Sequence, residues 1–233
     1  MAVEIIGGAV PDFARIFDVS EDLREACPNW QEVLVGIAAK HAQSKTTTGE
    51  NDPTSRMLPG SSPVTASRVY PAVLAEQASW LIDFCHDTAT GLARLVFGQT
   101  YHGAGADTAS LFDFNVADLS RTSSGGTYGE PHVDSPSGAG LLCISAGTKE
   151  GYALTQFMLG NGFFDPNGAV ELRLEPGQIA FFNGNRRTHR AVERVPASRL
   201  ALPALRVTVA INFCGENEFD PSQRAAHNAT LYP

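Results

Sequence analysis

The sequence predicts an α+β fold, mainly β, in which helices near the N-terminus support an antiparallel sandwich or barrel. Apolar residues recur at helical spacing up to about residue 97, and from about residue 110 they alternate with polar ones, as in half-buried strands. Neither an internal repeat nor a linker divides the 233 residues, and undivided β domains reach this length. We therefore expect one domain over 1–233, with mainly helical support over 1–105, the β core over 106–216 and a C-terminal tail over 217–233.

The bulk composition is typical of a soluble globular protein, with 43% hydrophobic and 18% charged residues. No apolar run approaches the roughly 18 residues of a membrane span, and the first residues lack the basic start and apolar core of a secretory signal. The four cysteines stand far apart without a CxxC pair, which favours free thiols in a reducing compartment. We expect a cytoplasmic protein with no membrane partner, and Cys143 and Cys214 as core thiols because both lie in apolar runs.

A net charge of −8 and a pI of about 5.2 argue against a protein whose whole surface binds nucleic acid. Six of the 17 basic residues nevertheless lie within 186–206. This arginine cluster either lines the mouth of a site for an anionic substrate or forms a solvated surface. Strand alternation from His189 turns Arg190 and Arg194 away from that histidine, which favours the surface for these two.

Residues 11–43 carry the first helical signals. Ser20 and Asn29 are good N-cap residue types, and Glu32 follows Asn29 at the spacing of a capping box. One helical face then carries Val33, Ile37 and Ala38.

The segment 44–65 is rich in Ser, Thr, Gly and Pro and contains no aromatic residue, so we expect a flexible loop. Two interpretations stay open for this segment: a surface loop without a function, or a lid over a site. Helical spacing returns over 66–97, where an apolar stripe typical of core packing contains Tyr70, Val73, Leu74, Trp80, Leu81 and Phe84.

The second half reads as short strands separated by Gly, Pro and Asn turns. In the first strand, Phe112, Phe114 and Val116 alternate with polar or small residues. The expected strands lie within 110–120, 138–146, 152–160, 169–174, 178–184, 189–195 and 205–215.

The stretch GEPHVDSPSG, residues 129–138, places His132 and Asp134 one residue apart at the end of a β-like segment. Alternate strand residues point to the same side, so an imidazole and a carboxylate are presented together. Alone the pair is weak evidence, because either residue also suits a turn that bonds to the backbone. A third donor, His189, opens a later strand 57 residues on, and two imidazoles with one carboxylate form the facial triad of non-haem Fe(II) oxygenases.

An arginine then opens the last strand. Arg206 precedes the alternating run VTVAINF, and Thr208 stands two positions on, on the same face. A guanidinium offers a planar fork that matches a carboxylate, and a buried one requires a partner. If no acidic side chain pairs with it, a ligand carboxylate is the natural candidate.

With these motifs, residues 110–215 resemble the Fe(II)/2-oxoglutarate-dependent dioxygenase superfamily. The resemblance rests on His132–x–Asp134, His189 and Arg206–x–Thr208, together with the passage LEPGQIAFFNGNRRTHRAVERV. It implies a double-stranded β-helix, a jelly-roll or cupin-like barrel, with the N-terminal helices as its support.

The resemblance also implies roles for residues. His132, Asp134 and His189 would be the catalytic metal ligands for Fe(II), and 2-oxoglutarate would chelate the metal while its far carboxylate meets Arg206 and Thr208. O2 is the second cosubstrate, and 2-oxoglutarate is decarboxylated to succinate. Nearness to His132 adds Arg121 and Tyr128 as cofactor-pocket candidates. A carboxylate at position 134 argues for oxygenation over halogenation, which needs a small residue there.

The chain departs from the family pattern in one spacing. The interval from the second histidine to the arginine is usually near ten residues, whereas His189 and Arg206 are 17 apart and Arg199 stands ten after the histidine. The alternating strand favours Arg206, and Arg199 remains the alternative. Glu130 remains an alternative ligand, and we interpret the other histidines as structural or surface residues: His41, His86, His102 and His227.

We expect an oxygenase that hydroxylates a small molecule, such as an amino acid or a natural-product intermediate. Desaturation or cyclisation would use the same site. The alternatives are an oxygenase of a protein residue or nucleobase, for which the arginine cluster is the support, and a non-catalytic β-barrel that binds a ligand without metal.

Overall fold

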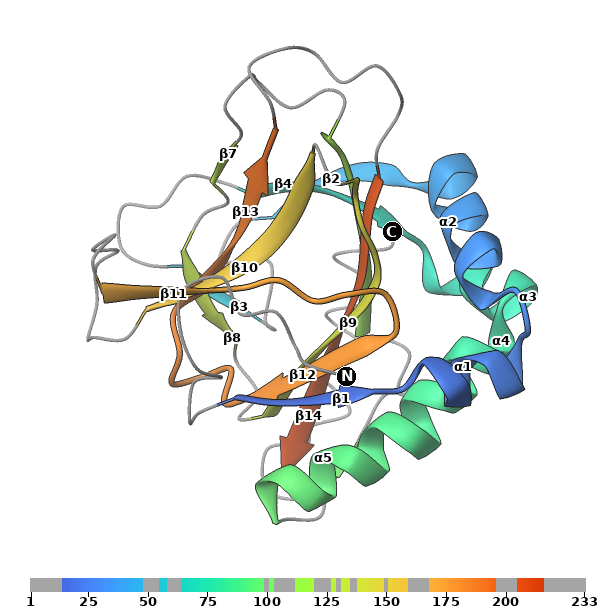
Figure 1. The fold of residues 1–233 in the computed structure, drawn as a ribbon, viewed down its shortest axis with the longest axis horizontal. Coiled ribbons are helices and arrows are strands. Elements are labelled where there is room, and N and C mark those ends of the chain that lie inside the picture. The colour runs from blue at the N-terminus through green and yellow to red at the C-terminus, as the bar shows by residue number, and fades with distance from the viewer. Residues whose placement is uncertain are drawn as a thin grey trace.

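The structure is a computed structural model in which the chain forms two facing antiparallel sheets with helices on one side (Figure 1). No helix within the described part of the chain is long and apolar enough to cross a membrane. The described residues are 14–47, 55–57, 64–98, 101–102, 112–119, 127–128, 131–134, 138–148, 151–158, 168–195 and 205–215.

The larger sheet, here called the major sheet, holds the long central strands β9 and β14 next to each other. Its order is β1 (Ala14–Asp18), β12 (Gln178–Phe182), β9 (Gly138–Ala146), β14 (Leu205–Gly215), β6 (Phe112–Asp118), β4 (Val64–Val69) and β2 (Gln43–Thr47), with β5 (Tyr101–His102) paired to β14.

The second sheet, here called the minor sheet, contains the strands that begin at the two predicted histidine ligands. Its order is β11 (Ala169–Leu172), β10 (Tyr152–Met158), β13 (His189–Arg194), β8 (His132–Asp134) and β3 (Ser55–Met57), with β7 (Thr127–Tyr128) paired to β13. From β8 to β14 the chain passes repeatedly between the two sheets, and apart from the hairpin β10–β11 consecutive strands lie in opposite sheets while sequence-distant strands pair. This winding is a double-stranded β-helix, and the predicted fold class is confirmed.

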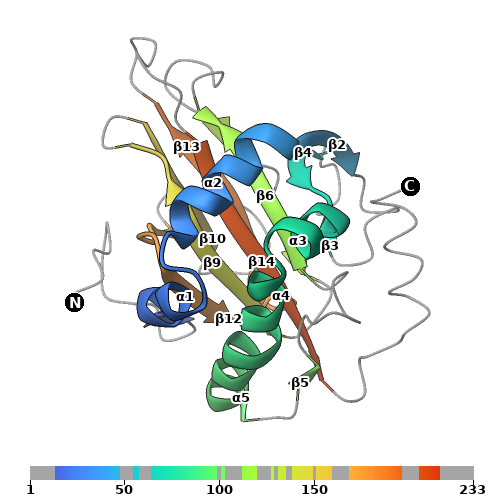
Figure 2. The same cartoon turned by 90° about the vertical axis from the view of Figure 1, so that its right-hand side faces the viewer.

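The helices cover the outer face of the major sheet (Figure 2). Buried side chains of α2, among them Leu34 and Ile37, share one core with Phe114 of β6 and Val209 of β14. The helical elements are α1 (Ser20–Ala26), α2 (Trp30–His41), α3 (Pro71–Gln77), α4 (Ser79–Phe84), a π-helix (Cys85–Ala89) and α5 (Thr90–Phe97).

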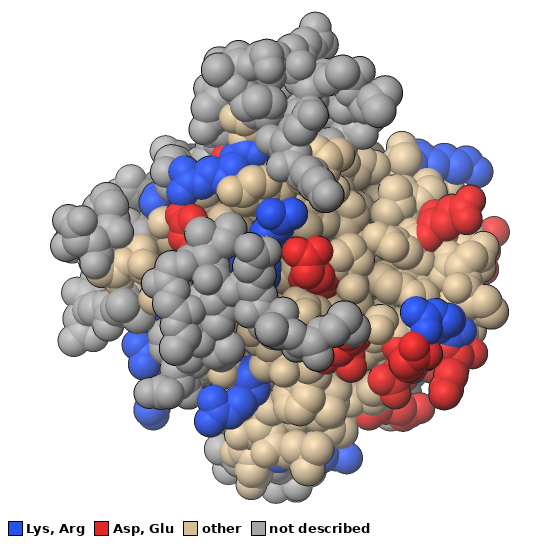
Figure 3. Space-filling view, viewed as in Figure 1, with Lys and Arg blue, Asp and Glu red and all other residues tan. Residues whose placement is uncertain are grey.

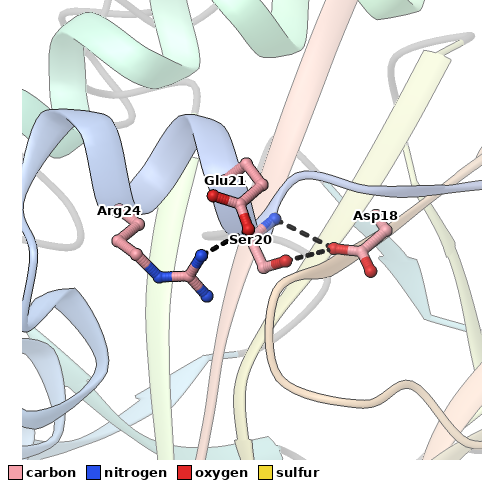
Figure 4. A network of polar contacts seen from close by, with 4 residues as sticks. All are labelled: Asp18, Ser20, Glu21 and Arg24. Atoms are coloured by element: carbon pink, nitrogen blue, oxygen red, sulfur yellow. Dashed lines mark hydrogen bonds and ion pairs between the residues drawn. The ribbon is translucent and has the colours of Figure 1, made fainter.

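The start of α1 differs in detail from the expected N-cap. Ser20 is the first residue of the helix, and the carboxylate of Asp18 accepts hydrogen bonds from its backbone N–H, at 3.0 Å, and its hydroxyl, at 2.6 Å (Figure 4). These bonds lower the pKa of Asp18. Asn29 directly precedes α2, as predicted, although its side chain makes no capping hydrogen bond.

Strand β14 divides the molecule into two cores by simple alternation. Val207, Val209, Ile211 and Phe213 face the helices and belong to the larger core. The residues between them therefore face the minor sheet, on what we call the inner face: Arg206, Thr208, Ala210 and Asn212. A smaller apolar cluster, which includes Phe157, Phe182 and Leu172, fills the space between the sheets.

A β-bulge interrupts the pairing of β9 with β14 beside Arg206. Cys143 pairs with Thr208 and Ser145 with Val207, so Ile144 has no partner on β14. Gln31 of α2 donates to the Ile144 carbonyl at 3.1 Å, and the Ser145 hydroxyl donates to Leu205 O at 2.7 Å. These side chains stabilise the bulge that sets the start of β14.

The strands expected after residue 110 are confirmed, but three N-terminal expectations are wrong. Residues 14–18 form β1 rather than helix, because they pair with β12 along the sheet edge. The expected loop 44–65 contains most of β2, all of β3 and the start of β4, and residues 66–69 belong to β4 rather than to a helix. These strands pair through their backbones with existing strands, so they need no apolar run of their own.

Candidate functional site

The predicted ligands come together at the place where β8 and β13 pair. His132 lies directly opposite His189 in the register, and Asp134 follows on the same face of β8. One donor atom from each residue lies within 4.8 Å of the others. The two imidazole centroids are 4.5 Å apart, and His189 Nε2 lies 3.6 Å from Asp134 Oδ2. Two strands far apart in sequence thus present one compact set of donors.

The ring of His189 is held in the orientation that a metal ligand needs. Its Nδ1 lies 2.9 Å from the carbonyl oxygen of Arg187, which accepts a hydrogen bond, so Nε2 keeps its lone pair on the side of Asp134. The rings of Phe157 and Phe182 pack against the imidazole, with centroids 5.8 and 5.1 Å away. Burial lowers the pKa of His189 against a smaller opposing effect of Asp134, which favours the neutral, metal-binding imidazole.

The turn after β12 positions Asp134. The backbone N–H of Asp134 donates a hydrogen bond to Gly184 O, in this turn, at 3.0 Å. A Cβ on Gly184 would lie 2.7 Å from Asp134 Oδ2 and 3.0 Å from the Cβ of Ala139. Only a residue without a side chain lets this turn pass so close to the carboxylate.

A recess between the sheets holds the other predicted residues. Arg206 and Thr208 line it from β14, together with Cys143 of β9, Thr155 of β10 and Leu172; we call it the Arg206 recess. Thr208 is buried, and the guanidinium of Arg206 forms no ion pair with a carboxylate of the described residues. Burial lowers the pKa of Arg206, with Cys143 and Glu193 acting in the opposite direction. A half-buried cation that forms no ion pair with a described carboxylate suits a carboxylate ligand.

Cys143, at the wall of this recess, behaves as the predicted core thiol. Burial raises its pKa to about 12, so the sulfur stays protonated and packs as an apolar group. The side chain of Cys214 lies outside the described residues.

Two members of the arginine cluster, Arg190 and Arg194, lie away from the donor set. Arg190 Nε donates to Gln156 Oε1 at 2.8 Å, and Arg194 pairs with Glu171, both on the outer face of the minor sheet as alternation predicted. On the face of the molecule shown in Figure 3, acidic side chains gather over the region of α1, whose first turn carries Glu21 and Asp22.

Several predicted residues are not brought to the site by the described part of the structure. Tyr128 lies in β7, whose backbone pairs with Val192, and its side chain is not described. His41 contacts Gln77, and His86 is exposed beside Asp87, as expected of structural or surface residues. The candidates outside the described residues are Arg121, Glu130, Arg199 and His227.

Sequence reasoning missed Asn212 on the inner face of β14. It is 6% exposed and lies opposite Ala139, which touches the same turn as Asp134. The available signal was an amide side chain within the alternating run that already carries Arg206 and Thr208.

Fold and donor set together define a double-stranded β-helix with a two-histidine, one-carboxylate cluster. No family model and no curated protein matches the sequence. Among solved structures, the fold is similar to an oxidoreductase of the 2OG-Fe(II) oxygenase family from Burkholderia pseudomallei, at 9% identity, 89% coverage of each chain and a TM-score of 0.52. It is also similar to SnoN, a non-haem α-ketoglutarate-dependent epimerase from nogalamycin biosynthesis, at 14% identity, covering 86% of this chain and 77% of that one, with a TM-score of 0.51. The predicted resemblance is confirmed at the level of the fold.

Proposed function

We propose that the chain is a non-haem Fe(II)/2-oxoglutarate-dependent oxygenase that hydroxylates a small molecule. One observation carries the proposal: the donor set of His132, Asp134 and His189 lies between the same two sheets as the half-buried Arg206, which forms no ion pair with a carboxylate of the described residues. Imidazole and carboxylate donors suit Fe(II), and three of them on one side leave positions for exogenous ligands.

In this proposal the two ends of the cosubstrate have separate anchors. Arg206 binds the far carboxylate of 2-oxoglutarate through its guanidinium fork, with the Thr208 hydroxyl as a further donor. The spacing is suitable, because Thr155 lines the Arg206 recess and Phe157, two residues along β10, pairs with His189. Two residues of strand span roughly 7 Å, which is of the order of the length of a five-carbon diacid.

The role of the protein residues in this chemistry is to hold the metal and to shield the site from water. When bound, Fe(II) activates O2 at the expense of 2-oxoglutarate, which is oxidised and decarboxylated to succinate. Burial favours the neutral form of His189, and its hydrogen bond to Arg187 O leaves Nε2 available to bind the metal. The rings of Phe157 and Phe182 exclude water from one side of the site.

The proposed substrate class is a small molecule, such as an amino acid or natural-product intermediate. The similarity in fold to an epimerase of nogalamycin biosynthesis supports this class. The support for a macromolecular substrate is the arginine cluster, and two of its members, Arg190 and Arg194, are engaged on the outer face of the minor sheet. Desaturation and cyclisation require the same residues and differ only in how the substrate is held.

The test is succinate formation from 2-oxoglutarate with Fe(II) and O2, measured without a prime substrate because uncoupled turnover does not require one. We expect the wild type to produce succinate and Asp134→Ala to lose at least about 100-fold in rate, since removing a ligand costs more than disturbing its support. Asp87→Ala, at an exposed aspartate, is the matched control and should retain the wild-type rate. Equal rates for wild type and Asp134→Ala would contradict the proposal, and a chain that binds no metal would indicate a non-catalytic ligand-binding barrel.

A further inference from the structure

Asn212 is a buried polar residue for which the fold alone gives no reason. Its neighbours Ile211 and Phe213 lie in the helix-side core, so alternation turns Asn212 to the inner face. It is only 6% exposed, and its carboxamide makes no hydrogen bond to any of the described residues. Burying an amide side chain costs free energy that an apolar residue at the same place would avoid.

The register places Asn212 on the wall opposite the donor set. Asn212 pairs with Ala139, and Ala139 pairs on its other side with Phe182. The ring of Phe182 packs on His189, while a Cβ on Gly184 would touch both Ala139 and Asp134. Ala139 therefore lies between Asn212 on one side and, on the other, the Phe182 ring and the turn that touches Asp134.

The inner face of β14 carries polar groups at two separated levels. Arg206 and Thr208 stand at the Arg206 recess, the small Ala210 follows, and Asn212 stands near the donors. A ligand that reaches from the metal to Arg206 would meet polar side chains at both ends and a methyl group between them.

We propose that the carboxamide of Asn212 donates a hydrogen bond to the carboxylate with which a 2-oxo acid chelates the metal. This inference rests on the proposed function and deepens it, because it assigns the metal-side anchor of the cosubstrate. An amide NH2 group supplies donors to a carboxylate, which only accepts. Among the inner-face residues at this level, Ala139 and Phe182 supply no such donor.

The test separates the two ends of the ligand with two probes. The Fe(II)-loaded protein is titrated without O2 with 2-oxoglutarate and with 2-oxobutyrate, a monocarboxylate that lacks the far carboxylate. Binding is followed by the visible charge-transfer absorption that a chelated 2-oxo acid produces on Fe(II). We expect Asn212→Leu to weaken both acids by the same factor, about tenfold. Arg206→Ala should weaken 2-oxoglutarate alone.

Metal content, measured in the same samples, should equal that of the wild type for both variants. Asn212→Ser is the second variant. It shortens the side chain without adding volume, so binding can still be measured if the leucine variant does not fold. Wild-type affinity for both acids in a metal-loaded Asn212 variant would overturn the assignment. So would a loss confined to 2-oxoglutarate, which would move Asn212 to the far end. If the wild type itself gives no absorption with either acid, the proposed function fails with it, and that outcome is distinct from a wild type that binds both and variants that do not differ.

Discussion

The turn after β12 passes close to the carboxylate of Asp134. Gly184 accepts a hydrogen bond from Asp134 N–H and leaves no room for a Cβ. The proposed metal ligand is thus positioned by a residue that contributes no side-chain atom, from a turn 50 residues further along the chain.

Gly184→Ala should weaken metal binding without removing a ligand. The new methyl would lie 2.7 Å from Asp134 Oδ2, so the carboxylate must move, and disturbing the support of a ligand costs about 10- to 100-fold in affinity. The measurement is Mn(II) affinity by competition with a chelator.

Gly36→Ala is the matched control for this substitution. Gly36 is exposed within α2 with nothing within 4 Å of the added Cβ, so metal affinity should stay unchanged while the helix gains up to about 1 kcal/mol. Equal metal affinities for the two variants would show that the turn does not position Asp134.

At this scale the sequence carried much of the candidate site. His132, Asp134, His189 and Arg206 were identifiable as candidates because they follow one another in this order at the ends of expected strands. Asn212 was missed because its place opposite Ala139 of β9 depends on the strand register, which the order of residues does not contain. The bulge at Ile144 was equally hidden, since it depends on a helix side chain, Gln31, reaching its carbonyl.

Among the elements, α2 has the most direct part in covering the major sheet. Its buried side chains meet β6 and β14 in the helix-side core. Leu34→Ala should therefore lower the free energy of unfolding by about 2–5 kcal/mol, through lost burial and the cavity left behind. Urea unfolding monitored by circular dichroism measures the change.

Leu95→Ala makes the same chemical change on α5, where the side chain is 78% exposed, and should alter the free energy of unfolding by less than about 0.5 kcal/mol. Similar losses in the two variants would mean that the helices do not seal the sheet as described.

Strands with a buried face were predicted from the sequence, whereas strands held mainly by backbone pairing were not. The strands after residue 110 alternate or are apolar throughout, because each has at least one face in a core, and their ranges were predicted within a few residues. β2, β3 and β4 lie toward one side of the two sheets in a Ser- and Thr-rich segment, where backbone pairing is decisive and composition suggests a loop. β1 was masked by the helix signals that directly follow it.

For the whole molecule, the donor set and the Arg206 recess lie between two sheets that must pack before either site exists. Ligands that bind only this packed state stabilise it by mass action.

Mn(II) and 2-oxoglutarate, each at about 100 times its dissociation constant, should each add about 2.7 kcal/mol of stability, or roughly 5–10 °C in Tm. Differential scanning calorimetry measures the shift, and a chelator should reverse the metal's part. Asp134→Ala should lose the shift produced by metal. A shift of equal size in that variant would place the bound metal elsewhere on the protein.

The alternation along β14 has a consequence for redesign. Positions 206, 208, 210 and 212 meet the ligand space, while positions 207, 209, 211 and 213 meet the helices. A combinatorial library confined to the even-numbered positions would therefore explore new cosubstrate preferences while leaving untouched the apolar contacts that keep the barrel folded.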